Sequence, residues 1–225
     1  MPHADVGYFQ EDKSVPVLDW LRELQQRDRR AYAKCVARIQ RLAQEGHALR
    51  RPEADYLRDG IYELRARQGR VNYRILYFFH GQNVVILANG LTKKDEVPTP
   101  RSSEPSAEKR LSSRTRSFIS MRKPMAKKTH DAIKILDRLT GDDPELREMI
   151  AEEAVNLHVA RMIYDARIAA GLTQKQLADM IGTQQSVIAR LEDADYEGHS
   201  LSMLRRIAEA LDQKLEVRFV PNRAA

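Results

Sequence analysis

The chain has 225 residues, 42% of them hydrophobic, which is enough apolar side chain for one large core or two small ones. Its single cysteine, Cys35, can build neither a disulfide framework nor a zinc site, and we expect no metal and no cofactor. No apolar run approaches the ~20 residues of a membrane span, and the first residues lack a signal pattern. We therefore expect a cytoplasmic protein with no membrane partner.

Charge and composition divide the chain into three parts. The net charge of Lys and Arg against Asp and Glu is +4 over residues 1–97, +7 over 98–128 and −5 over 129–225. Opposite signs suggest that each end has a charged partner, which the other end can supply; the alternative is ordinary solvated charge. Residues 98–128 hold four of the nine prolines and many serines, which predicts a linker. Met121 and Met125 are followed by lysines, as at the start of a separate protein, so we interpret this linker as the seam of a fusion.

The first part carries two helical patterns and then strands. Apolar residues recur at helical spacing over 17–24 and again over 32–43, where Gly46 ends the pattern. Residues 61–67, 71–79 and 83–88 are rich in β-branched and aromatic side chains and are separated by glycine-containing turns. Two helices covering an antiparallel sheet predict a small α+β domain.

The last part reads as all-α with a strand at its end. Helices are expected over 132–139, 144–169 and 200–211, with two short helices between the last two. In the tail, Leu215, Val217 and Phe219 alternate with charged residues, which predicts a β-strand over 215–220 that needs a pairing partner.

The segment AGLTQKQLADMIGTQQSVIARLE, residues 170–192, has the pattern of two helices joined by a sharp turn at Gly182. Thr173 is placed to cap the first of them, and Val187, Ile188 and Leu191 form the inward face of the second. The outward positions of that second helix are then polar. They are Gln185, Ser186 and Arg190, with Ala189 between them.

This segment resembles the Cro and phage-repressor (XRE) helix-turn-helix family. The resemblance implies that Gln174 and Gln184 hold DNA phosphates, and that Gln185, Ser186 and Arg190 face base edges in the major groove. It also implies a homodimer on a palindromic operator, for which the tail strand could pair across the two-fold axis. Arg161 and Arg167, on the preceding helix, either meet phosphates or pair with acids such as Asp165.

Cations gather on the strands of the first part. Arg65 and Arg67 share one strand face with Glu63, Arg74 lies on the next strand, and Lys93 and Lys94 follow the third. Tyr73 and Tyr77 stand among them as candidates for stacking or proton transfer. From composition alone, an ordinary solvated sheet face is the preferred interpretation of this pattern.

The stretch LRDGIYELRAR, then VNYRILYFF and a later Lys-Lys pair, resembles the phage-derived Gp49-like branch of the RelE/HigB toxin superfamily over about residues 6–97. The resemblance implies an endoribonuclease that cuts mRNA on the ribosome and whose gene is followed by that of an XRE-type antitoxin. Arg65, Arg67 and Arg74 would stabilise charge on the phosphate, and Lys93, Lys94 or Tyr77 would move the proton.

These patterns together predict a toxin and an antitoxin fused in one chain, with the antitoxin half also repressing its own operon. Residues 129–160 contain eight acidic and three basic side chains, and we expect Asp142, Asp143, Glu145 and Glu148 to cover the basic face of the toxin half. The alternative is a transcriptional regulator whose first half is a catalytically inactive RelE-like binding module.

Overall fold

The computed structural model describes residues 4–11, 14–94 and 131–218, which form two compact units. The first unit is Met1–Ala151 and the second is Glu152–Ala225. The division falls inside one helix, α5 (Pro144–Ala169), rather than at the expected linker. The linker of residues 98–128 lies outside the described residues.

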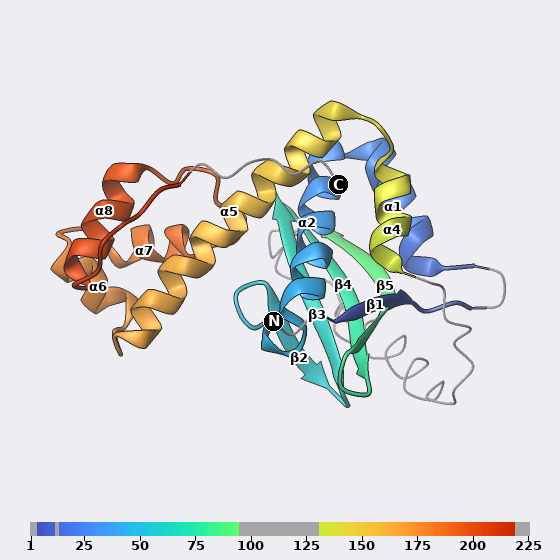
Figure 1. Cartoon of the computed structure of the whole chain (residues 1–225), viewed down its shortest axis with the longest axis horizontal. Coiled ribbons are helices and arrows are strands. Elements are labelled where there is room, and N and C mark those ends of the chain that lie inside the picture. Colours follow the sequence, from blue (N-terminus) through green and yellow to red (C-terminus); the bar gives the residue numbers. More distant parts are fainter. Residues whose placement is uncertain (1–3, 12–13, 95–130, 219–225) are drawn as a thin grey trace, which may run out of the picture. The chain divides into compact units, whose positions relative to one another are not determined.

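The first unit is built on a five-stranded sheet in the order β1-β5-β4-β3-β2 (Figure 1). Strand β1 runs parallel to β5, and the other neighbours are antiparallel. Gly69 lies in the two-residue turn between β3 and β4. Its φ of 58° is in the left-handed region, which residues with a side chain rarely adopt. The strands are β1 (Asp5–Tyr8), β2 (Ala54–Arg58), β3 (Ile61–Gln68), β4 (Val71–His80) and β5 (Val84–Lys94).

Two helices between β1 and β2 pack on this sheet, α1 (Pro16–Arg27) against β5 and α2 (Arg29–Glu45) against β3. Pro16 stands at the first position of α1, and the Asp28 carboxylate caps α2 by accepting from the backbone N–H of Ala31 at 2.9 Å. The apolar face of each helix is buried, Cys35 included, and a short 3-10 helix, η1 (Gly46–Ala48), follows α2. These contacts fix which face of the sheet the helices cover.

A third helix, α4 (Ala132–Thr140), and the start of α5 complete the same core. Leu136, Leu146 and Ile150 are buried in it together with side chains of α1, α2 and β1. Hydrogen bonds that reach across the sequence hold the segment in place: Tyr8 Oη donates to the Ala132 carbonyl (3.1 Å), Gln25 Nε2 to the Leu139 carbonyl (2.9 Å), and the Tyr32 and Thr140 hydroxyls share one (3.1 Å). Residues 132–151 therefore pack with the first unit, although their sequence places them after the expected linker.

The second unit consists of the remainder of α5 and three shorter helices. Its core holds Ile163, Leu177 and Leu204, with Ile188 and Leu191 between them. The helices are α6 (Gln174–Met180), α7 (Gln185–Leu191) and α8 (Leu201–Ala210). None of the described helices combines the length and the apolar character that crossing a membrane requires.

The C-terminal strand expected over residues 215–220 does not form among the described residues. Residues 213–218 have no regular secondary structure, and Phe219 and Val220 lie outside the described residues. Leu215 packs on the core of the second unit, whereas Val217 is 62% exposed. Alternation alone does not make a strand where no neighbouring strand supplies the hydrogen bonds.

Candidate nucleic-acid interfaces

Strand register gathers basic side chains on the sheet face opposite α1 and α2. Leu64 and Ala66 of β3 are buried in the core. The side chains that alternate with them therefore point to the other face, and these are Glu63, Arg65 and Arg67. Arg65 lies beside Arg74 of β4, which in turn lies beside Leu91 of β5. In the next row, Arg67 lies beside Asn72, which lies beside Lys93. We call this surface the arginine face.

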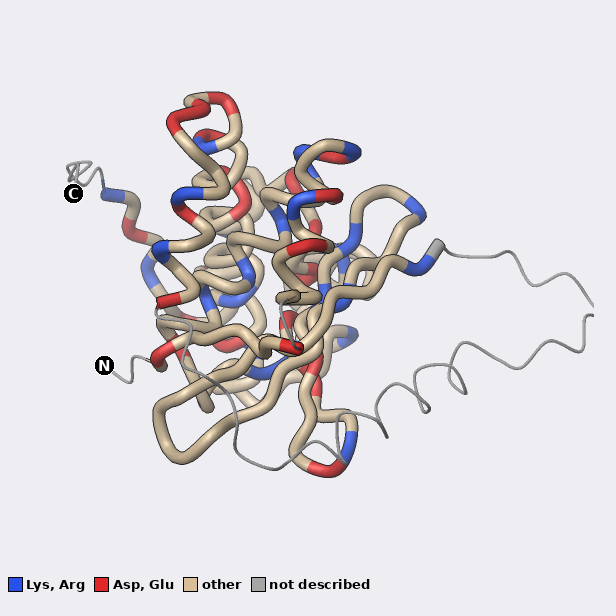
Figure 2. The backbone as a smooth tube through the Cα atoms, turned by 90° about the vertical axis from the view of Figure 1, so that its right-hand side faces the viewer, with Lys and Arg blue, Asp and Glu red and all other residues tan. Residues whose placement is uncertain are grey.

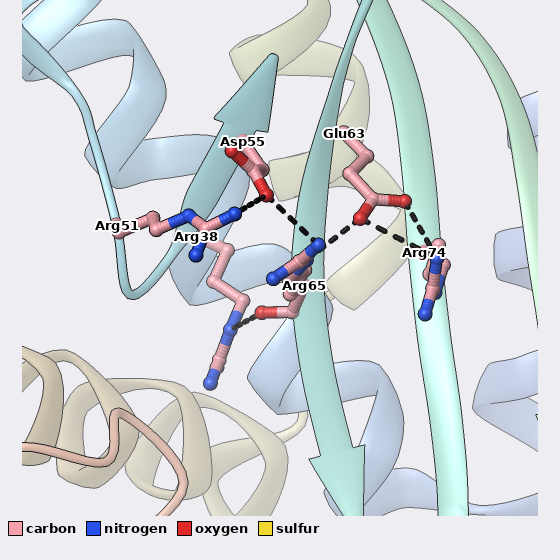
Figure 3. A network of polar contacts seen from close by, with 6 residues as sticks. All are labelled: Arg38, Arg51, Asp55, Glu63, Arg65 and Arg74. Atoms are coloured by element: carbon pink, nitrogen blue, oxygen red, sulfur yellow. Dashed lines mark hydrogen bonds and ion pairs between the residues drawn. The ribbon is translucent and has the colours of Figure 1, made fainter. Parts of the chain in front are cut away.

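Glu63 is fully buried and holds two arginines of this face (Figure 3). Its carboxylate accepts from Arg65 Nε at 2.6 Å and from Arg74 Nη1 at 3.0 Å. The side chains of Arg65 and Arg74 remain 40% and 31% exposed, and each guanidinium has five N–H groups. The buried carboxylate thus fixes two neighbouring cations while part of each guanidinium stays at the surface.

A second carboxylate extends the network to the edge of the sheet (Figure 3). Asp55 of β2 accepts from Arg65 Nη2 at 3.0 Å and from Arg51 Nη2 at 2.7 Å. Burial raises the pKa of Asp55, but the Arg51 hydrogen bond and the charges of Arg65 and Arg51 outweigh it, so the pKa lies below its usual value. Three guanidinium groups against two carboxylates leave the network with an excess positive charge, which suits a phosphate.

The backbone of Arg65 is also held from the helix side (Figure 3). Its carbonyl accepts from Nε of Arg38, a side chain of α2 that is 1% exposed, and its N–H donates to the Glu53 carbonyl at 2.8 Å. Arg65 is therefore fixed at both its backbone and its side chain.

The two tyrosines expected near the arginines lie on the other face of the sheet. Tyr77 is 1% exposed, and burial raises its pKa well above the usual range. Tyr73 is also buried; burial, with the charge of Asp28 and the hydrogen bond to it, raises its pKa to about 12. Lys93 is exposed on the arginine face, while the side chain of Lys94 lies outside the described residues.

In the second unit, capping and turn residues set the two short helices. Thr173 and Gln176 form a reciprocal capping box at the start of α6. Gly182, with φ 63°, makes the turn after α6. Ile188 and Leu191 of α7 are buried, which leaves the opposite side of that helix open; its exposed residues are Gln184 at the N-cap, then Gln185, Ser186 and Arg190.

A hydrogen-bonded chain leads from the core to the exposed start of α7. Glu192 is 3% exposed and accepts from Arg167 Nη2 at 2.8 Å and from Gln174 Nε2 at 2.9 Å. Gln174 Oε1 then accepts from Gln185 Nε2 at 2.8 Å. A carboxylate only accepts, so Gln174 must offer its NH₂ group to Glu192, and its oxygen is left to orient the Gln185 amide.

Family comparisons cover both of these surfaces. Residues 19–112 match the family described as phage derived protein Gp49-like, and residues 163–217 match the helix-turn-helix family. The chain joins a Gp49-like toxin-family domain to an XRE-type helix-turn-helix domain. No curated protein matches the chain.

Two arginines whose roles the sequence left open pair with acids in the helix-turn-helix unit. Arg167 binds the buried Glu192, and its pKa is raised chiefly by the hydrogen bond to that carboxylate. Arg161 binds Asp165 at 2.8 Å. Arg167, which is 6% exposed, is therefore a core residue rather than a surface cation.

The acidic segment does not lie over the arginine face of the Gp49-like unit, which corrects the expected masking. Asp143 binds Arg29 at the start of α2 at 2.8 Å, and Glu145 binds the same guanidinium at 3.3 Å. Asp142 and Glu148 are exposed on the same segment, which packs on the helix side. Acidic and basic positions are interspersed along most of the chain (Figure 2), so local pairs take up these charges.

Sequence reasoning missed part of the network. Asp55 and Arg51 were not expected at the site because strand β2 was not predicted. The sequence offered no usable signal for this strand, because β2 has only five residues and its register shifts between Tyr56 and Arg58.

Proposed function

We propose that the chain is a fused toxin and antitoxin, in which the Gp49-like unit is an mRNA endoribonuclease and the helix-turn-helix unit binds an operator. The observation that carries the nuclease half is the pair of guanidinium groups that Glu63 holds on neighbouring strands. Arginine N–H groups bind phosphate oxygens in a fixed, bidentate geometry. Two such groups fixed on one sheet face form a site for an RNA phosphate.

The reaction that suits this site is attack of an RNA 2′-OH on the adjacent phosphate. The 2′-oxygen bonds to phosphorus, its proton passes to a base, and the bond to the 5′-oxygen breaks as that oxygen gains a proton. Arg65 and Arg74 neutralise the charge that builds on the phosphate oxygens, with Arg67 in the next row. Tyr77 lies on the other face, so we assign proton transfer to Lys93, which is exposed on the arginine face.

A reconstituted translation system with a defined mRNA tests this half. The full chain is used because residues 132–151 belong to the first core. We expect cleavage fragments with the natural chain and about 10²-fold slower cleavage with Arg74→Met, as when one charge-stabilising group is removed. Arg22→Met is the matched control, because Arg22 is 54% exposed on α1 and pairs with Asp19. Equal cleavage by natural chain and Arg74→Met contradicts the proposal, and a reaction without ribosomes tests their requirement.

The second candidate is a transcriptional regulator whose Gp49-like unit binds a partner without cutting RNA. The position of Tyr77, buried on the face away from the arginines, favours it. Intact mRNA in the translation assay, together with retained operator binding, would support this candidate over the nuclease.

For the helix-turn-helix unit, we propose that α7 enters the major groove, with Gln174 and Gln184 at phosphates and Ser186 and Arg190 at base edges. The Gln185 amide, oriented by Gln174, retains an acceptor oxygen and one free N–H. That pair matches the N6 donor and N7 acceptor of adenine. Gln185 is therefore the adenine-reading residue.

Selection of binding sites from random duplex DNA, followed by titration, tests this assignment. Gln185→Ala should lose about 1–3 kcal/mol of discrimination at one A·T pair and keep its preference elsewhere. Lys134→Ala, which removes a 75% exposed cation from α4 in the first unit, serves as the control. Unchanged preference at every base pair in Gln185→Ala would contradict the assignment.

We further propose that two copies bind a palindromic operator. Residues of α8 and the tail line a hollow of about 520 Å³, and Leu201 and Val217 on its rim are each 62% exposed. Such an exposed apolar surface suits a second copy of the unit. Light scattering coupled to size-exclusion chromatography should give twice the chain mass, and Leu201→Glu should reduce it to one; a monomeric natural chain would contradict the dimer.

A further inference from the structure

A cluster of aromatic rings lies on the helix side of the sheet, along the edge formed by β2 and β3. Tyr62 stacks on Tyr77 with ring centroids 5.4 Å apart, and Phe79 meets both rings edge-on. Tyr56 meets Tyr62 edge-on at 5.2 Å, and His47 stacks on Phe79. We call these five rings the aromatic platform.

The outer rings of the aromatic platform are exposed and held in place. Tyr56 is 55% exposed, and its hydroxyl accepts from the backbone N–H of Gly60 at 3.5 Å. His47 is exposed, and Arg50 donates to its carbonyl and to that of Leu49. Tyr77 is buried beneath them. A large aromatic surface is therefore open to solvent while little conformational freedom remains to be lost on binding.

Exposed arginines lie in the segment that carries these rings and leads to the arginine face. The charge of Arg50 acts on Tyr77, Arg51 precedes β2, and Arg58 is its last residue; all three are exposed. Asp55, which binds Arg51 and Arg65, directly precedes Tyr56 on β2, the last strand in the sheet order. One edge strand thus carries the end of the arginine network on one face and the outermost ring of the platform on the other.

We propose that the aromatic platform stacks the bases of single-stranded RNA as the strand passes around the β2 edge from the arginine face. The inference deepens the proposed nuclease and rests on it. Aromatic rings interleaved with arginines are the chemistry that binds unpaired bases, since rings take the base faces and cations take the phosphates. A purely apolar protein partner would not need the three exposed arginines.

Fluorescence anisotropy of the full chain with a labelled, 2′-O-methyl single-stranded RNA tests the platform. This RNA lacks the attacking hydroxyl, so binding is measured without cleavage, and excess duplex DNA occupies the helix-turn-helix unit. Tyr56→Ala should weaken binding roughly five- to a hundredfold, the range for loss of one stacked base, and Tyr56→Phe should bind as the natural chain does. Val155→Ala is the control for truncating an exposed apolar side chain outside the site, because Val155 is 62% exposed on α5.

The salt dependence separates stacking from phosphate contact. Tyr56→Ala should leave the slope of log affinity against log salt unchanged, whereas Arg74→Met should reduce it by about 0.7, the value per phosphate contact on a single strand. Natural affinity in both Tyr56→Ala and His47→Ala overturns the platform while leaving the nuclease proposal intact. No RNA binding by the natural chain overturns both.

Discussion

In each unit, a buried carboxylate accepts hydrogen bonds from polar side chains and so fixes their positions. Glu63 binds Arg65 and Arg74 beneath the sheet surface, and Glu192 binds Arg167 and Gln174 beneath the helix-turn-helix surface. In each case the acid is almost inaccessible, and the group that it orients is the one that would meet nucleic acid. Under the proposed function, specificity at the surface would depend on these buried charges.

Removal of the Glu63 charge should destabilise the first unit. Glu63→Gln leaves two guanidinium groups side by side without their counter-charge, at a cost of roughly 3 kcal/mol, the low end for a broken buried pair because the arginines are partly exposed. Urea unfolding followed by fluorescence of Trp20, the only tryptophan, measures this unit. Asp19→Asn, which breaks an exposed pair with Arg22, should change stability by less than about 1 kcal/mol. A Glu63→Gln effect no larger than that of the control would contradict the prediction.

A second prediction concerns Gly90, where a Cβ atom would lie 2.1 Å from the Trp20 ring. Trp20 also donates through Nε1 to the Thr92 hydroxyl at 3.0 Å, so the indole has little room to move. Gly90→Ala should therefore destabilise the first unit by about 1–3 kcal/mol and alter the Trp20 emission. Gly69→Ala is the comparison, because its cost comes from backbone conformation alone with nothing near the added atom. Unchanged stability together with unchanged Trp20 emission in Gly90→Ala would contradict the prediction.

At the scale of helices and strands, periodicity predicted the elements that pack over their full length. The helical patterns of residues 17–24 and 32–43 lie within α1 and α2, and the patterns of 61–67 and 71–79 lie within β3 and β4. Strands β1 and β2 are too short to show a pattern, and they exist because a long neighbour supplies hydrogen bonds. The tail has the pattern but no such neighbour among the described residues, so its alternation predicted a strand wrongly.

The sequence also predicted only part of the candidate site. Arg65, Arg67, Arg74 and Lys93 were expected together, and strand register alone brings them to one face. Tyr77 was expected with them but lies on the other face, because the strand alternates its side chains. The docking of α4 could not be predicted, since its apolar stripe does not reveal which core it joins.

The attachment of residues 132–151, which form α4 and the start of α5, to the first core should depend on pH through Asp143. A hydrogen bond from the Leu146 backbone, then one from Arg29, lowers its pKa. A lowered folded pKa means that the stabilisation is complete above the ordinary value of about 3.9 and is lost as pH falls through the folded value. The urea midpoint of the natural chain should therefore exceed that of Asp143→Asn at pH 6, and the gap should narrow as the pH falls below about 3.9. A gap that does not narrow at acidic pH, or an equal one for exposed Glu148→Gln, would contradict this.

At the scale of the whole molecule, packing and sequence ancestry divide the chain at different places. Residues 132–151 follow the expected linker but supply Leu136, Leu146 and Ile150 to the first core. Each such side chain contributes about 2 kcal/mol by burial, and domain stability is only about 5–15 kcal/mol. The Gp49-like sequence alone is thus an incomplete folding unit.

Truncation tests this division. A chain ending at residue 151 should unfold in one cooperative Trp20 transition, whereas a chain ending at residue 94 should lack one or aggregate. The control is a chain ending at residue 151 that also carries Lys134→Ala. Because Lys134 is 75% exposed on α4, this change alters the segment without removing buried side chains. A cooperative transition of equal midpoint in the shorter chain would contradict the division.

The position of that division inside α5 matters to anyone who wishes to exchange one DNA-binding module for another. Leu146 and Ile150 of this helix belong to the first core, whereas Ile163 belongs to the second. Working chimaeras should therefore be spliced within α5 between Ile150 and Ile163, so that each module keeps the helical residues that its own core needs.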